Sequence, residues 1–169
     1  MTFMKRAVGL LVWIALLAGV AQAEKIVVAA EPLAVEAGLQ VLRDGGNAFD
    51  AAVAVGFVLA VTYPAAGNIS GGGFALVYRP GSEPVALDFR ETAPSRSTAD
   101  MFLDHQGDVD NDKALYSALA AGVPGTVRGL AEIHEIYGTW TWERLIQPAC
   151  DLAAQGYVLS ECLAGRIAG

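Results

Sequence analysis

The sequence predicts an α+β fold in which helices precede and follow one antiparallel hairpin. Helical periodicity with capping signals occurs on both sides of residues 74–89, where two short β-forming runs flank a turn rich in proline and glycine. The chain has 169 residues, enough for one domain or a piece of a larger one. Its composition, 54% hydrophobic and 17% charged, is that of a chain with a buried core and excludes charge-driven disorder.

Residues 1–23 predict a cleaved export signal. Lys5 and Arg6 precede an uncharged apolar run over residues 7–20, and an Ala-Gln-Ala sequence ending at residue 23 has the form of a signal peptidase site. A membrane anchor is the alternative, but about 14 apolar residues span only ~21 Å as a helix, less than a ~30 Å hydrocarbon core. We therefore expect a mature chain of residues 24–169 that works in the periplasm or the extracellular space.

The mature chain begins with a predicted strand and two predicted helices. Residues 26–30, with an Ile-Val-Val run, predict the strand. Pro32 suits the first turn of a helix that the two glycines at residues 45–46 bring to an end. Asn47 caps a second helix over residues 48–61, which is apolar on every side and must therefore be covered all round. A transmembrane span is the alternative for this helix, but its length is again too short.

After Pro64 the chain changes character. A glycine-rich segment, residues 67–73, leads into two runs of β-forming residues, 74–78 and 85–89, which predict an antiparallel hairpin. Five aspartates spread over residues 100–112 predict a solvated stretch. Helical periodicity then returns over residues 124–137 and 142–155. Pro148 is expected to kink the second of these helices.

Motifs for metal binding fail on inspection. Aspartates at positions 108, 110 and 112 have the spacing of a calcium loop, but Lys113 and Leu119 occupy the positions that require Gly and Glu. The pair His134-Glu135 lacks the second histidine of a zinc protease helix. We therefore predict no metal site and a solvated acidic loop.

Other functional classes are also excluded or left open. The net charge of −7, with no basic run after residue 6, gives no electrostatic surface for nucleic acid. Ser70 lies among glycines but outside a GxSxG motif, so it is not a predicted nucleophile. Cys150 and Cys162 are too far apart for a CxxC pair and could form one disulfide or remain two thiols. We favour buried thiols, because Cys150 lies in an otherwise apolar helical stretch.

Arg90 is the candidate ligand-binding residue. The second predicted strand places it at or just beyond the strand end, beside Glu91. A guanidinium binds a carboxylate through two parallel charge-assisted hydrogen bonds, so a substrate carboxylate is one partner for Arg90. The alternative is a structural salt bridge with the carboxylate of Glu91 or Asp88, and spacing alone favours this salt bridge.

Five groups of motifs follow one another along the mature chain. They are EAG at 36–38 with LRDGGNAFDAAVAV at 42–55; AVTYP, GNI and GGGF between 60 and 74; DFRETAP and DMFLD between 88 and 104; GVPGTV at 122–127 with Gly129; and YG, PA, LA and a glycine between 137 and 156. In this order they resemble the N-terminal part of the large subunit of γ-glutamyltransferases, also called γ-glutamyltranspeptidases or glutathione hydrolases.

The resemblance implies a fold and a chemistry. The complete fold would be the αββα sandwich of N-terminal-nucleophile hydrolases, of which this chain is the N-terminal portion. In the family, the Arg of the DFRETAP segment binds the α-carboxylate of the γ-glutamyl substrate, so Arg90 becomes the expected substrate-binding residue. The glycine loop is expected to act in packing and turn formation.

The resemblance also implies what the chain lacks. The catalytic nucleophile is a Thr at the N-terminus of the small subunit, which is cut from the same precursor, and it lies beyond residue 169. The expected activity is cleavage of γ-glutamyl amides such as glutathione, with transfer of the γ-glutamyl group to water, amino acids or peptides and without a cofactor. This chain alone would be inactive. A related acylase for glutaryl or cephalosporin side chains and a non-catalytic truncated product are the alternatives.

Overall fold

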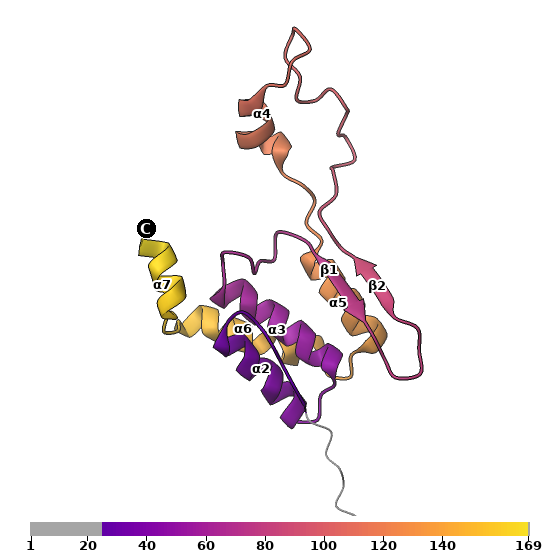
Figure 1. Ribbon diagram of the computed structural model, residues 1–169, viewed down its shortest axis with the longest axis vertical. Coiled ribbons are helices and arrows are strands. Elements are labelled where there is room, and N and C mark those ends of the chain that lie inside the picture. The colour runs from indigo at the N-terminus through magenta and orange to yellow at the C-terminus, as the bar shows by residue number, and fades with distance from the viewer. Residues whose placement is uncertain (1–24, 169) are drawn as a thin grey trace, which may run out of the picture.

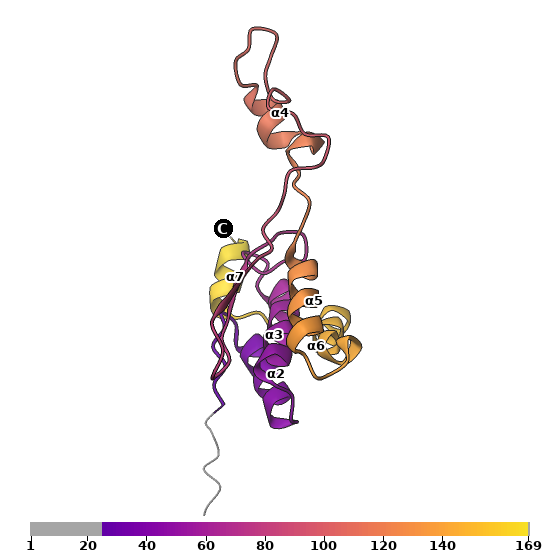
Figure 2. The same cartoon turned by 90° about the vertical axis from the view of Figure 1, so that its right-hand side faces the viewer.

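The computed structural model describes residues 25–168. The predicted export signal therefore lies outside the described residues. Four helices form a layer, and a two-stranded sheet and the extended segment 25–30 both lie on one side of it (Figure 2). The chain between strand β2 (Val85–Asp88) and helix α5 (Thr126–Tyr137) projects away from this body (Figure 1).

The first two described helices, α2 (Pro32–Arg43) and α3 (Ala48–Thr62), pack against each other. The predicted stop and cap are confirmed. Gly45 has a φ of 92°, a left-handed conformation that glycine adopts without strain. Asn47 accepts hydrogen bonds from the backbone N–H groups of residues 49 and 50, and the Asp50 side chain accepts one from the Asn47 N–H, which completes a capping box.

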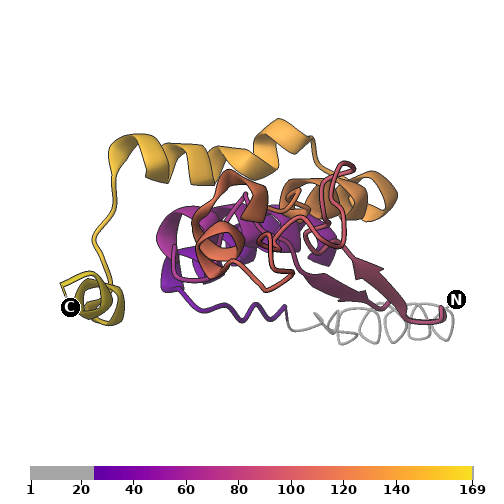
Figure 3. The same ribbon diagram turned by 90° about the horizontal axis from the view of Figure 1, so that it is seen from above.

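Two later helices, α5 (Thr126–Tyr137) and α6 (Trp142–Gln155), pack on α3 and complete the core. Pro148 lies inside α6, which remains one continuous helix, and Gly156 ends it with a φ of 78°. Seen from above, α6 lies along the face of the layer opposite the extended segment 25–30 (Figure 3). The main core cluster is drawn from all four helices: Val41, Leu42, Ala51, Val53, Ala54, Leu130, Ile133 and Leu145.

The predicted hairpin is confirmed within one residue. Strands β1 (Phe74–Val77) and β2 (Val85–Asp88) are antiparallel, with Phe74 opposite Asp88. Because side chains alternate along a strand, Ala75 and Leu87 face the helices, whereas Phe74 and Leu76 are 67% and 78% exposed. The sheet thus has one face on the core and one apolar face uncovered.

Three expectations were wrong. Residues 26–30 are extended but form no strand, since a strand needs a ladder partner and none lies beside them among the described residues. Helix α3 is not covered all round: Ala52 is exposed, and an apolar groove separates α3 from residues 26–28. Cys150 is an exposed free thiol, because it lies about 100° around α6 from the buried Ala149.

Three short elements were not predicted. The projecting segment contains helix α4 (Asn111–Tyr116) and the 3-10 turn η1 (Ala118–Ala120), and α7 (Glu161–Ala168) follows α6. The acidic stretch before α4 is exposed, as predicted. Within residues 25–168 no helix has both the length and the hydropathy needed to cross a bilayer.

Candidate functional site

Arg90 lies two residues beyond the end of β2, with its side chain 65% exposed. The antiparallel pairing continues past the strand, because the Phe89 N–H donates to the Gly73 carbonyl at 3.0 Å and the Gly73 N–H donates to the Phe89 carbonyl at 3.4 Å. The Arg90 N–H donates to the Asp88 carboxylate at 3.0 Å. The backbone leading into Arg90 is therefore held by hydrogen bonds, while the Arg90 side chain projects into solvent.

The glycine loop, residues 67–73, packs directly on the backbone of Arg90. A Cβ atom at Gly72 would lie 2.6 Å from the Arg90 Cα, so only glycine permits this approach. The Gly71 carbonyl accepts hydrogen bonds from the N–H groups of Gly125 at 2.8 Å and Thr126 at 3.0 Å. The loop thus joins the end of β2 to the beginning of α5, and its predicted packing role is confirmed.

The start of α5 packs against Phe89, the residue before Arg90. A Cβ atom at Gly125 would lie 1.9 Å from the Phe89 carbonyl oxygen, and one at Gly129 would lie 2.1 Å from the Phe89 Cγ. Just outside, Thr92 and Val123 form an isolated antiparallel bridge. Three motifs that are far apart in sequence, the glycine loop, DFRETAP and GVPGTV, therefore meet around residues 89–92.

The electrostatic surroundings leave the Arg90 guanidinium available to a ligand. Its Nε lies 3.8 Å from Glu91 Oε2, and its Cζ lies 5.9 Å from the centre of the Phe74 ring. Asp88 binds the Arg90 backbone, and the one ion pair is between exposed side chains, which contributes little to stability. Chemically, an exposed guanidinium on a fixed backbone is suited to hold a carboxylate.

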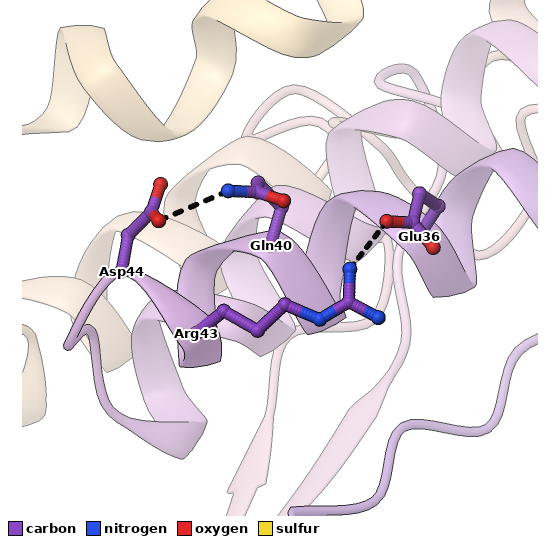
Figure 4. Close-up of polar contacts among 4 residues, drawn as sticks. All are labelled: Glu36, Gln40, Arg43 and Asp44. Atoms are coloured by element: carbon purple, nitrogen blue, oxygen red, sulfur yellow. Dashed lines mark hydrogen bonds and ion pairs between the residues drawn. The ribbon is translucent and has the colours of Figure 1, made fainter.

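Several polar groups elsewhere in the described chain have partners within the chain. On the outer face of α2, Arg43 pairs with Glu36 at 2.6 Å and Gln40 donates to Asp44 at 2.9 Å (Figure 4). The His134 Nε2 contacts the Trp140 carbonyl at 2.7 Å. Within residues 25–168 no three His, Cys, Asp or Glu side chains gather where they could hold a metal ion.

The family model described as gamma-glutamyltranspeptidase matches residues 34–169. The chain belongs to the γ-glutamyltranspeptidase family. It is 48% identical over 139 residues to the "Glutathione hydrolase proenzyme" of Escherichia coli strain K12, a match that covers 82% of this chain and 24% of that relative. The predicted family is therefore confirmed, and the chain spans about a quarter of the length of this curated relative.

Solved γ-glutamyltranspeptidases share the fold. The Helicobacter pylori enzyme matches with a TM-score of 0.80 at 50% identity, over 87% of this chain and 43% of that one. A cephalosporin acylase from Bacillus halodurans matches with a TM-score of 0.68 at 28% identity, over 87% of this chain and 28% of that one. The predicted fold class is confirmed, and the described residues are the N-terminal portion of the αββα sandwich. The name of the Escherichia coli glutathione hydrolase relative describes it as a proenzyme.

Sequence reasoning located Arg90 but missed what holds it in place. The role of Phe89 and the contact between Gly129 and its ring were not predicted, although GVPGTV and Gly129 were recognised as family motifs. A glycine inside a helical pattern, where it lowers stability relative to alanine, was the available signal of a close approach.

Proposed function

We propose that this chain is the N-terminal part of an exported γ-glutamyltransferase precursor, which cleaves γ-glutamyl amide bonds such as that of glutathione. The observation that carries the proposal is Arg90, an exposed guanidinium on a backbone enclosed by the glycine loop and the start of α5. The family membership and the glutathione hydrolase relatives support the same substrate class.

In this function Arg90 binds the α-carboxylate of the γ-glutamyl donor. The donor carries this carboxylate far from the scissile amide, so holding it fixes the distance between the amide carbonyl and the nucleophile and lowers the entropic barrier. The nucleophile is a Thr from the small subunit of the same precursor. Its hydroxyl attacks the carbonyl and expels the amine, and water or an amino acid then takes the γ-glutamyl group from the ester. No cofactor takes part, and this chain alone is inactive.

Export and assembly complete the proposal. Residues 1–23 direct export to the periplasm or beyond the cell and are then removed, which leaves residues 24–169 as the first part of the large subunit. The rest of the precursor, including the small subunit, covers the uncovered face of the hairpin. The exposure of Phe74 and Leu76 on that face, together with that of Ile26 and Val28, supports a further packed layer.

The test is Arg90→Ala in the full-length precursor, compared with Arg43→Ala. Arg43 is a matched control, because it is 56% exposed and makes an ion pair on the outer face of α2. Loss of a charge-assisted pair costs roughly 1.5–3 kcal/mol, so Arg90→Ala should raise KM for a γ-glutamyl donor by about 10-fold to 150-fold. An Arg90→Ala enzyme whose KM equals that of the control would refute the assignment.

A second candidate is an acylase that acts on glutaryl or cephalosporin side chains. A relative from Pseudomonas sp. strain V22 named "Acylase ACY 1 proenzyme" is 37% identical over 84% of this chain. A glutaryl donor lacks the α-amino group of a γ-glutamyl donor. Equal activity of the precursor on both donors would favour the acylase, and a strong preference for the γ-glutamyl donor would favour the first proposal.

A further inference from the structure

Phe89 is the point where two glycine-containing segments, the glycine loop and the start of α5, converge. Its ring packs on bare backbone, since a Cβ atom at Gly129 would lie 2.1 Å from the Phe89 Cγ and one at Gly73 would lie 3.0 Å from Cε2. Its carbonyl oxygen is enclosed as well. A Cβ atom built at Gly125 would lie 1.9 Å from this oxygen, and one built at Gly72 would lie 2.6 Å from it. A Cβ atom at Gly72, Gly125 or Gly129 would require Phe89 or its neighbours to move, and one at Gly73 would make a tight contact with the ring.

The ring of Phe89 also ties this convergence to the core. It is partly buried and packs against the main core cluster of α2, α3, α5 and α6. The next residue, Arg90, has no comparable contact of its own side chain, which is exposed and lies 5.9 Å from the Phe74 ring centre and 3.8 Å from Glu91. The guanidinium therefore extends from a backbone whose position depends on Phe89 together with the contact of Gly72 on the Arg90 Cα.

We propose that Phe89 is a positioning residue for substrate binding. Its ring, clamped between Gly73 and Gly129, fixes the origin of the Arg90 side chain relative to the helical layer. This inference rests on the proposed function, because it assumes that Arg90 holds the donor carboxylate. A binding group needs support from residues that are themselves locked by packing, and the clamped ring provides that support.

The experiment compares Phe89→Leu with Phe49→Leu in the full-length precursor. Phe49 is a matched control, because it is a partly buried phenylalanine on the same core cluster and stacks on Tyr137, at the opposite end of α5 from Gly129. Both variants should lower the thermal midpoint to a similar extent. Only Phe89→Leu should raise KM for the γ-glutamyl donor, by about tenfold with kcat little changed, the pattern of a lost contact that the substrate complex and the transition state share.

A second pair of variants keeps the test decisive if Phe89→Leu does not fold. Gly129→Ala displaces the ring by adding a Cβ atom, whereas Gly165→Ala adds one on α7 where nothing lies within 4 Å. Gly129→Ala should raise KM and Gly165→Ala should not. With a donor that lacks the α-carboxylate, neither Phe89→Leu nor Gly129→Ala should change KM beyond its control.

The outcomes distinguish a failure of the inference about Phe89 from a failure of the proposed function. A rise in KM in Arg90→Ala together with Phe89→Leu and Gly129→Ala supports both. A rise in Arg90→Ala alone overturns the role of Phe89 and leaves the proposed function standing. No rise in Arg90→Ala overturns the carboxylate site, and the inference about Phe89 falls with it.

Discussion

Asp50 forms the most extensively bonded polar contact in the described core, and its removal gives a quantitative test of the fold. The side chain is 0% exposed. Its Oδ1 accepts from the backbone N–H groups of Thr139 at 2.9 Å and Trp140 at 3.3 Å, and its Oδ2 accepts from the Asn47 N–H at 2.9 Å and the Thr139 hydroxyl at 2.6 Å. One carboxylate thus joins the first turn of α3 to the turn between α5 and α6.

Two substitutions at Asp50 should differ in cost. Asp50→Ala leaves four neutral donors without their acceptor inside the protein, and because each buried donor left unpaired costs about 1–3 kcal/mol, we expect a total loss of about 3–5 kcal/mol. Asp50→Asn retains an oxygen for Thr139 and Trp140 but turns an amide group toward the Asn47 N–H, so we expect a loss of about 1–3 kcal/mol. Asp44→Ala is the control: Asp44 is exposed, 4.0 Å from Arg144, and worth at most about 1 kcal/mol.

The assay is hydrogen–deuterium exchange of the full-length precursor at pH 7, followed in peptides that cover residues 47–51 and 138–141. A loss of 3 kcal/mol corresponds to about a 150-fold increase in the population of the open state. Exchange in both peptides should accelerate most in Asp50→Ala, less in Asp50→Asn and little in Asp44→Ala. Equal exchange in Asp50→Ala and Asp44→Ala would refute the reasoning.

Three further predictions concern stability, and the thermal midpoint of the precursor measures each. Burial raises the pKa of Asp50, but the hydrogen bonds from the Thr139 side chain and from three backbone N–H groups outweigh it and hold the pKa below its ordinary 3.8. Its contribution is therefore full above pH 3.8 and lost as the pH falls through the lowered pKa, so the midpoints of wild type and Asp50→Asn should converge in acid. Leu145→Ala, at a fully buried position, should cost about 2–5 kcal/mol; an unchanged midpoint would contradict the core packing. Gly72→Ala should destabilise, since its Cβ would meet backbone at 2.6 Å, whereas Gly165→Ala on open α7 should gain up to about 1 kcal/mol.

Local signals were reliable where neighbouring residues decide the structure. The cap at Asn47, the glycine stop at residues 45–46 and the hairpin turn between β1 and β2 depend on contacts within a few residues, and each occurs where it was predicted. Local sequence signals also predicted correctly that Arg90 lies just beyond the end of β2.

Expectations failed where distant partners decide. Residues 26–30 have the composition of a strand, but strand formation requires a second chain segment with which to pair. Cys150 has an apolar setting in sequence, but the rotation of α6 about its axis places Ala149 inside and Cys150 outside. The short helix α4 was missed because it has no buried face to leave a periodic pattern.

The sequence by itself determined the family, the order and ends of the main helices, the hairpin and the position of Arg90 at a strand end. Only the tertiary structure decided why the glycines of two separate motifs matter. Gly72 in the glycine loop and Gly125 and Gly129 at the start of α5 closely approach residues 89 and 90, which joins segments up to 57 positions apart. The physical reason is that caps and turns are satisfied by neighbouring residues, whereas steric exclusion between backbones depends on the packed fold.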